Sequence, residues 1–207
     1  MSKNVGLIIV LSGPSGVGKG TVNRILQKTN TNIMTSVSVT TRPPREGELE
    51  GVSYYFKSRE EFELLIKEDS FVEYACVYGN YYGTLKSELE RIIGMGKSVI
   101  LEIDTYGAKN IKKLIPNSVS IFVLPPSLAE LERRIEGRGT EECQSLTKRV
   151  IAAKEEIAFA RYYDYIVVND EATCCASEVA TIIRAEMLKV KNNSALIDDI
   201  IGGNNIC

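Results

Sequence analysis

A glycine-rich stretch near the start of the chain constrains the fold more than any other feature. Residues 12–21 read SGPSGVGKGT, and the segment from Gly13 to Lys19 has the spacing of a phosphate-binding loop, G-x-x-x-x-G-K. The apolar run GLIIVLS precedes this segment, and a helical pattern, TVNRILQK, follows it. A strand, a glycine loop and a helix in this order direct backbone N–H groups and a helix N-terminus at an anion. We therefore expect an α/β protein that binds phosphate groups here.

The end of this loop departs from the usual pattern. Gly20 stands where a serine or threonine normally contacts Mg²⁺, although Thr21 still offers a hydroxyl in the first turn of the predicted helix. Mg²⁺ in proteins usually keeps several water ligands. We expect the ion to be held mainly by phosphates and water, and we assign it no direct protein ligand.

Alternating strands and helices along the chain support the same fold class. Short apolar runs at residues 6–12, 98–104, 118–124 and 165–169 are typical of buried parallel strands, and helical patterns lie between some of them. The chain has 207 residues, enough for one domain with inserted subdomains. We predict a parallel sheet flanked by helices, with right-handed crossovers.

Two segments interrupt this alternation. Residues 36–92 contain TTRPPREGELEG, short tyrosine-rich strands and one helix, and they predict an inserted subdomain. Residues 127–150 carry two helical arms around EGRGTEE and predict a lid. Residues 191–207 are expected to form a flexible tail. The predicted core is made of residues 1–35, 93–126 and 151–190.

Composition narrows the possible chemistry. The chain has no histidine, the commonest general base and metal ligand. Its five cysteines include no C-x-x-C pair, which favours a reduced, cytoplasmic protein. The net charge of −2 gives no indication of nucleic-acid binding, and no apolar run approaches the ~18 residues of a membrane span. Lysine, arginine, carboxylates, hydroxyls and a bound ion are therefore expected to carry the chemistry.

A second group of candidate residues lies in the predicted insertion. In residues 36–56, SVSVTTRPPREGELEGVSYYF, Arg42 and Arg45 flank two prolines that restrict the backbone and reduce the entropy lost on binding. Guanidinium groups match phosphate oxygens well, although a surface arginine by itself is usually only solvated. Residues 71–84, FVEYACVYGNYYGT, add a carboxylate, further tyrosines and a threonine.

The paired tyrosines are expected to divide their roles. Side chains alternate between the two faces of a strand, so one tyrosine of each adjacent pair should pack inside the subdomain. We expect Tyr55 and Tyr81 to pack there, and Tyr54 and Tyr82 to turn their hydroxyls to a ligand.

Two carboxylates end the predicted strand at residues 98–104. Alternation puts Glu102 and Asp104 on one face, at the strand end where ligands gather in parallel sheets. Glu102 would orient Mg²⁺-bound water or pair with a nearby arginine, and the sequence leaves both roles open.

These stretches together closely resemble guanylate kinases, enzymes that phosphorylate GMP with ATP. The resemblance covers about residues 6 to 186, and the GKGT ending of the loop is also used by adenylate kinases. Tyr106 departs from the family, which usually has glutamine in D-x-Q-G. Nine stretches carry the resemblance in the family's order: SGPSGVGKGT, SVTTRPPREGE, GVSYYF, FVEYA, GNYYGT, LEID, RRIEGRGTE, KRVIAAKEEI and VVND.

The resemblance implies ATP as co-substrate, Mg²⁺ as cofactor and GMP as acceptor, with the use of dGMP left open. The implied ATP-binding residues are Gly13, Pro14, Ser15, Gly16, Val17, Gly18, Lys19, Gly20, Thr21 and Asn169. The implied GMP-binding residues are Ser38, Arg42, Arg45, Tyr54, Glu73, Tyr82, Thr84, Glu102 and Asp104. The implied catalytic residues are Lys19, Arg42, Arg138 and Arg149.

Within the implied GMP site the roles differ by chemistry. The arginines and tyrosines hold the phosphate, Ser38 and Thr84 hydrogen-bond guanine O6, and Glu73 and Asp104 read N1–H and the N2 amine. Two other functions remain open, a non-catalytic binding module of guanylate-kinase type and another nucleoside monophosphate kinase. The oligomeric state is left open between monomer and homodimer.

Overall fold

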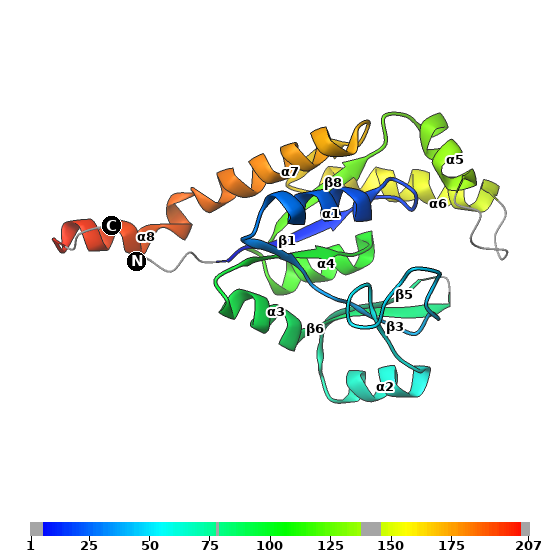
Figure 1. Ribbon diagram of the computed structural model, residues 1–207, viewed down its shortest axis with the longest axis horizontal. Coiled ribbons are helices and arrows are strands. Elements are labelled where there is room, and N and C mark those ends of the chain that lie inside the picture. Colours follow the sequence, from blue (N-terminus) through cyan, green and yellow to red (C-terminus); the bar gives the residue numbers. More distant parts are fainter. Residues whose placement is uncertain (1–5, 78, 138–145, 204–207) are drawn as a thin grey trace.

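A parallel sheet of five strands lies at the centre of the computed structural model, which describes residues 6–77, 79–137 and 146–203 (Figure 1). The strands are β1 (Ile8–Ser12), β2 (Ile33–Thr35), β7 (Ser98–Glu102), β8 (Val119–Leu124) and β9 (Tyr165–Val168). They lie in the order β2-β7-β1-β8-β9, and neighbours are parallel. The predicted fold class and the four predicted core strands are confirmed. The pattern does not predict β2, because three residues are too few to show a period.

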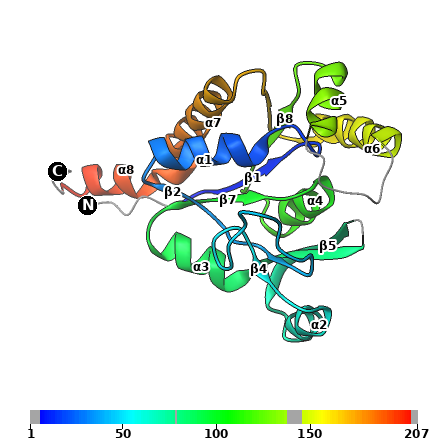
Figure 2. The same cartoon turned by 45° about the vertical axis from the view of Figure 1, so that its right-hand side comes forward.

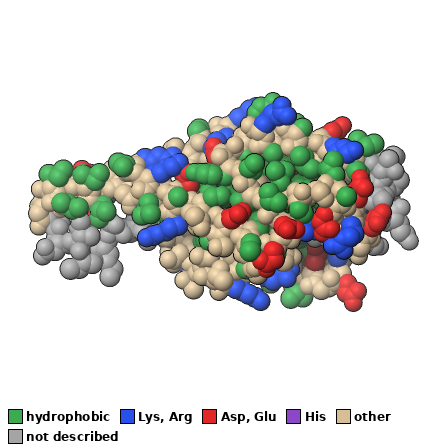
Figure 3. Space-filling view, turned by 90° about the horizontal axis from the view of Figure 1, so that it is seen from above, with side chains coloured by type: hydrophobic (Ala, Val, Ile, Leu, Met, Phe, Trp, Pro, Cys, Tyr) green, Lys and Arg blue, Asp and Glu red, His purple; other side chains and the backbone are tan. Residues whose placement is uncertain are grey.

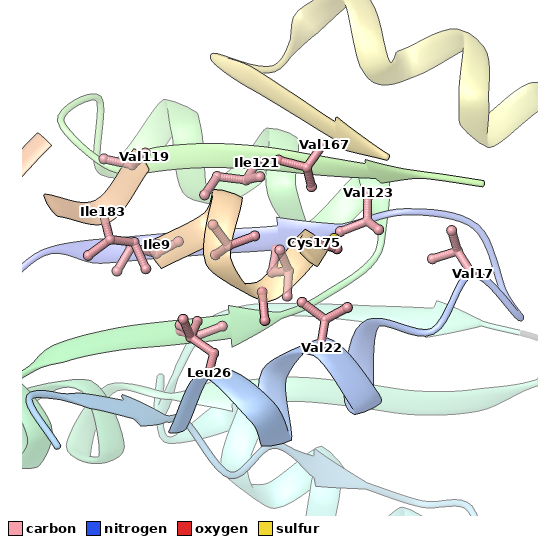
Figure 4. Close-up of a cluster of buried hydrophobic side chains, with 14 of the residues drawn as sticks. Ile9, Val17, Val22, Leu26, Val119, Ile121, Val123, Val167, Cys175 and Ile183 are labelled. Carbon is pink, nitrogen blue, oxygen red and sulfur yellow. The ribbon is translucent and has the colours of Figure 1, made fainter. Parts of the chain in front are cut away.

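Helices cover both faces of this sheet, as Figure 2 shows. They are α1 (Lys19–Thr29), α3 (Lys86–Gly94), α4 (Thr105–Leu114) and α7 (Ala172–Met187). Ile9 of β1 packs with Val22 of α1 and Cys175 of α7 in a fully buried cluster on one face (Figure 4). The next residue, Val10, packs with Ile111 of α4 on the opposite face. Strand β1 therefore needs apolar residues on both sides, which is why it reads as a continuous apolar run.

A second sheet forms the insertion, in the order β4-β3-β6-β5. Its elements are β3 (Val39–Thr40), β4 (Tyr55–Phe56), α2 (Arg59–Lys67), β5 (Phe71–Val77) and β6 (Asn80–Leu85). Ser58 and Glu61 form a capping box that starts α2. Phe62 of α2 is fully buried and stacks on Tyr81 with ring centroids 5.1 Å apart. Helix α3, which the sequence pattern assigned to the insertion, instead packs Leu89 against the central sheet.

The predicted lid, residues 127–150, contains α5 (Leu128–Glu136) and the start of α6 (Leu146–Ala158). Most of α6 lies in the predicted core, and a short 3-10 helix, η1 (Phe159–Tyr162), follows it. The residues between α5 and α6, Arg138 among them, lie outside the described part of the chain. The expected flexible tail, residues 191–207, includes the end of η2 (Val190–Asn192) and a further helix, α8 (Ser194–Ile201). Helix α8 projects from the body (Figures 1 and 3). Its residues Ile200 and Ile201 are exposed. None of the helices in the described ranges has the length and apolar character of a membrane span.

The cysteines that the structure describes are not bonded to one another. Cys76, Cys174 and Cys175 are free thiols, and Cys175 is part of the buried cluster beneath α1. Burial raises the pKa of the Cys175 thiol to about 11, so it remains protonated and apolar in character. Cys175 therefore has a structural role in the core, whereas its neighbour Cys174 is exposed.

Candidate active site

The glycine-rich loop joins β1 to α1, at the carboxyl end of the central strand, as predicted. Gly16 and Gly18 have φ angles of 88° and 98°, a region that side chains disfavour. A Cβ on Gly18 would lie 2.5 Å from Nδ2 of Asn169, and a Cβ on Gly16 would lie 2.8 Å from Ile135 of α5. These glycines let the loop fold tightly between β9 and the lid helix.

Lys19 begins α1 and turns back over the loop. Its Nζ donates to the carbonyl oxygen of Gly13 at 2.6 Å and to that of Pro14 at 3.4 Å. Burial raises the pKa of the Glu156 carboxyl on α6, while the positive charge of Lys19 and a hydrogen bond from the Ser15 backbone act against that rise. The ammonium and the loop amides thus already face a carboxylate, the kind of anion that this loop geometry favours.

Asn169 supports the loop from the end of β9. Its side chain is buried, and Nδ2 donates to the carbonyl oxygen of Val17 at 2.7 Å. Arg134 of α5 donates to the Asn169 carbonyl oxygen at 2.9 Å and to Glu130 at 2.7 Å. The sequence pattern gave these two residues no supporting role, because the contacts join segments 35 and 152 residues apart.

Glu102 faces the first turn of α1. A Cβ on Gly20 would lie 3.8 and 3.9 Å from the two carboxylate oxygens of Glu102, so the missing side chain leaves this carboxylate open to the loop. Asn23 donates to Glu102 at 3.4 Å, and Thr35 donates to Asn23 at 2.9 Å, which fixes the carboxylate from behind.

Metal ligands are sparse around this carboxylate. Within the described ranges there is no group of three acidic or cysteine residues that could bind a metal ion. One carboxylate beside a phosphate loop is compatible with a Mg²⁺ ion bound mainly through phosphates and water, and that mode of binding stays a prediction.

Arg42 lies in the insertion with its side chain only 10% exposed. Its guanidinium donates to Glu48 at 2.9 Å and to the Pro43 carbonyl oxygen at 2.7 Å, and it lies 5.5 Å from the ring centroid of Tyr54. Its Nε is buried without a hydrogen-bond partner. A buried guanidinium with one orphaned donor suits an additional anionic ligand.

Glu48 organises this segment, although the sequence pattern did not single it out. One oxygen binds the Arg42 guanidinium, and the other accepts a hydrogen bond from the backbone N–H of Arg45 at 2.8 Å. The Glu48 carboxylate thus bridges Arg42 and Arg45 and stabilises the turn of the Arg-Pro-Pro-Arg segment. In the sequence, only its position at the end of the stretch RPPREGE indicated that Glu48 could belong to the site.

The tyrosine pairs divide as alternation predicts. Tyr55 and Tyr81 pack against the buried cluster of the small sheet, whereas the rings of Tyr54 and Tyr82 meet edge to face at 6.1 Å on the side of Arg42. Burial raises the pKa of Tyr54 to about 12, and the nearby charge of Glu102 adds to this effect. Glu102 therefore lies between the phosphate loop and the tyrosines of the insertion.

Glu73, Thr84 and Asp104 come together where the small sheet meets α4. Thr84 Oγ1 donates to Glu73 Oε1 at 2.8 Å, and Glu73 is only 7% exposed. Burial raises the pKa of Glu73 to about 7, with the Asp104 charge adding to the rise and the Thr84 bond opposing it. Asp104 also caps α4, because its Oδ1 accepts from the backbone N–H of Gly107 at 2.7 Å.

Three remaining candidates are Ser38, Arg149 and Arg138. Ser38 is half-buried and precedes β3, where its carbonyl oxygen accepts from the Tyr55 backbone N–H at 2.9 Å. Arg149 is half-buried near the start of α6. Arg138 lies outside the described residues, so the predicted action of these two arginines on a transferring group stays a prediction.

Comparison with known proteins gives a consistent result over nearly the whole chain. The family model for guanylate kinase matches residues 6–186, the span of the resemblance seen in the sequence. A curated guanylate kinase of Halalkalibacterium halodurans is 51% identical over 189 residues, covering 91% of this chain and 93% of the relative. One of Clostridium tetani is 52% identical over 185 residues, covering 89% and 88%.

A solved structure supports the same assignment. The crystal structure of guanylate kinase from Anaplasma phagocytophilum superposes with a TM-score of 0.76 at 41% sequence identity, covering 89% of this chain and 88% of that chain. Both the sequence relatives and this fold agree with an enzyme of that family, and none favours a non-catalytic module.

Proposed function

The chain belongs to the guanylate kinase family, and on that basis we propose that it transfers the γ-phosphoryl group of ATP to GMP, producing ADP and GDP. The observation that carries the proposal is the pairing of two separate sites in one molecule. A phosphate loop with Lys19 ends the central strand, and a buried Glu73–Thr84 pair lies on the inserted sheet. Glu102 faces the loop, and its charge raises the pKa of Tyr54 of the insertion.

The ATP phosphates would be bound by the loop amides, the N-terminus of α1 and Lys19. Lys19 would exchange its bonds to Gly13 and Pro14 for bonds to phosphate oxygens, which are stronger acceptors because they are charged. When bound, Mg²⁺ would neutralise part of the phosphate charge, and Glu102 and Thr21 would hold its water ligands in place.

The GMP phosphate would be bound by the guanidinium groups of Arg42 and Arg45 and the hydroxyls of Tyr54 and Tyr82. Arg42 has an orphaned buried Nε and is already held by Glu48. An arginine fixed in this way loses little entropy when it binds a phosphate.

Guanine would be read by Glu73, whose carboxylate can accept hydrogen bonds from both N1–H and the N2 amine. Adenine offers a lone pair at N1 and no amine at C2, so AMP would place an acceptor, in place of two donors, against the buried carboxylate. The hydroxyl of Thr84 has one proton, which it now donates to Glu73. It can donate to guanine O6 only after it releases Glu73, so the two N–H groups of guanine would replace it there.

The transfer itself requires positioning and charge neutralisation more than a strong base, which suits a chain without histidine. Lys19, Arg42 and the lid arginines would meet the negative charge that spreads over the transferring group. The role of Arg138 and Arg149 is part of this proposal. A cytoplasmic location is proposed as well, and the proposal leaves open whether the protein is a monomer or a homodimer and whether it uses dGMP.

A coupled assay of ADP formation tests this function directly. Purified protein with ATP and Mg²⁺ should phosphorylate GMP, while AMP, CMP and UMP should react at least about 10³-fold less efficiently, because polar matching can discriminate by about 10⁴-fold. Chelation of Mg²⁺ should abolish the reaction. Binding of GMP without turnover would instead support the non-catalytic module, and a preference for AMP would support another monophosphate kinase.

A further inference from the structure

Gly107 lies in the first turn of α4 and faces the carboxylate of Glu73. A Cβ placed on Gly107 would lie 2.6 Å from Glu73 Oε2 and 3.2 Å from Glu73 Cδ. Ordinary van der Waals contact with a Cβ begins at 3.4 Å, so any side chain here would collide with the carboxylate. The closest neighbour of this glycine is thus a side-chain oxygen of the guanine site.

The backbone offers no other reason for glycine at this position. Gly107 is helical and is not among the residues with positive φ. Alanine is a better helix former than glycine, so the helix alone would favour alanine. The cap bond from the Gly107 N–H to Asp104 is a backbone bond, and an alanine N–H would donate in the same way.

The carboxylate is held tightly on its other side. Thr84 Oγ1 donates to Glu73 Oε1 at 2.8 Å, and the Glu73 side chain is buried between β6 and α4. The two oxygens therefore have different neighbours, a hydroxyl on Oε1 and the bare Cα of Gly107 beside Oε2. The absence of a side chain on Gly107 therefore determines how closely the Glu73 carboxylate can approach α4.

We propose that Gly107 is a specificity-determining residue for guanine, because its missing side chain lets the Glu73 carboxylate take the position that accepts N1–H and the N2 amine together. This inference rests on the proposed reading of guanine by Glu73. A methyl group would push Oε2 away by about 0.8 Å, the difference between 2.6 Å and ordinary contact at 3.4 Å. The carboxylate ends a flexible side chain, so the fold accommodates the shift, whereas a two-point hydrogen bond does not.

The test is Gly107→Ala, with Gly94→Ala as the matched control. Gly94 ends helix α3, its φ is not positive, and a Cβ there would meet nothing within 4 Å. Gly107→Ala should lower kcat/KM for GMP at least about tenfold, mainly through KM, since a misplacement of about 1 Å can cost about 100-fold. KM for ATP should not rise and the melting temperature should not fall. Gly94→Ala should leave all kinetic constants unchanged.

A double-mutant cycle identifies the cause. In a Glu73→Ala background the carboxylate is gone, so adding Gly107→Ala should change kcat/KM for GMP less than about twofold. An equal loss in both backgrounds would show that Gly107 acts through some other contact and would overturn the inference. Wild-type kinetics for Gly107→Ala would overturn it as well.

The inference and the proposed function fail in different ways. If Glu73→Gln lowers GMP use while Gly107→Ala does not, only the role of Gly107 is refuted. If Glu73→Gln leaves the selectivity for GMP over AMP unchanged, guanine is read elsewhere and both statements are refuted. If the wild-type chain does not phosphorylate GMP at all, the proposed function itself is wrong.

Discussion

The carboxyl group of Glu73 should control how GMP use depends on pH. Its pKa is raised to about 7, first by burial and further by the Asp104 charge. Guanine presents two donors at N1–H and N2, so only the ionised carboxylate can accept both. GMP binding should therefore require that Glu73 lose its proton, and kcat/KM for GMP should rise as the pH rises through about 7.

The size of the effect follows from this pKa. With a pKa of about 7, roughly one-eleventh of Glu73 is ionised at pH 6 and roughly ten-elevenths at pH 8, so kcat/KM should rise about tenfold between them. The GMP phosphate also titrates near pH 6, with its own effect on binding. Glu73→Gln separates the two, because it keeps the phosphate titration and removes that of the carboxylate.

Stability should change with pH in the opposite direction. The native carboxyl binds its proton more tightly than the unfolded one, whose pKa is about 4.5, so the free energy of unfolding should fall as pH rises from about 4.5 to 7. A shift from 4.5 to about 7 corresponds to roughly 3 kcal/mol. Glu73→Gln should lose this part of the pH dependence.

The assay is a coupled measurement of kcat/KM for GMP from pH 5.5 to 8.5 at saturating ATP, for wild type and Glu73→Gln, with urea unfolding at the same pH values. Glu73→Gln should also lower kcat/KM for GMP at least about tenfold, with KM for ATP nearly unchanged, because a charge-assisted bond is worth roughly 1.5–3 kcal/mol. If both proteins show the same pH profile, Glu73 does not titrate in the guanine site and the reasoning is refuted.

Three further outcomes are expected. Lys19→Ala should reduce kcat to less than about a tenth while the protein stays folded by circular dichroism, because the lysine contacts loop carbonyls, is not part of the buried apolar cluster around α1, and is proposed to bind the transferring phosphoryl group. Arg42→Lys should raise KM for GMP at least about tenfold in the coupled assay, since an ammonium cannot bind Glu48 and a phosphate with a planar fork. An unchanged KM would contradict that role. A bisubstrate analogue that joins adenosine and guanosine through phosphates should bring residues 36–92 and 127–150 together, excluding water from the phosphoryl group; unchanged small-angle scattering and hydrogen exchange would contradict the closure.

Much of the fold and the site could be predicted from local patterns. The loop spacing placed Lys19 and its glycines between a strand and a helix, and the apolar runs located four of the five central strands. Period-two alternation separated Tyr55 and Tyr81, which pack inside the small sheet, from Tyr54 and Tyr82, whose rings meet each other. These features depend on backbone geometry over a few residues, so they can be predicted from the order of neighbouring residues.

Other features depended on contacts between distant segments. No local period indicates that Glu73 meets Gly107, that Asn169 binds the loop carbonyl of Val17, or that α3 packs on the central sheet. The raised pKa of Glu73 likewise arises from burial where a strand of one sheet meets a helix of the other. Sequence alone determined which groups this protein has for binding phosphate and guanine. Only the tertiary structure decided which of them are desolvated together, because desolvation depends on the packing of segments that lie far apart along the chain.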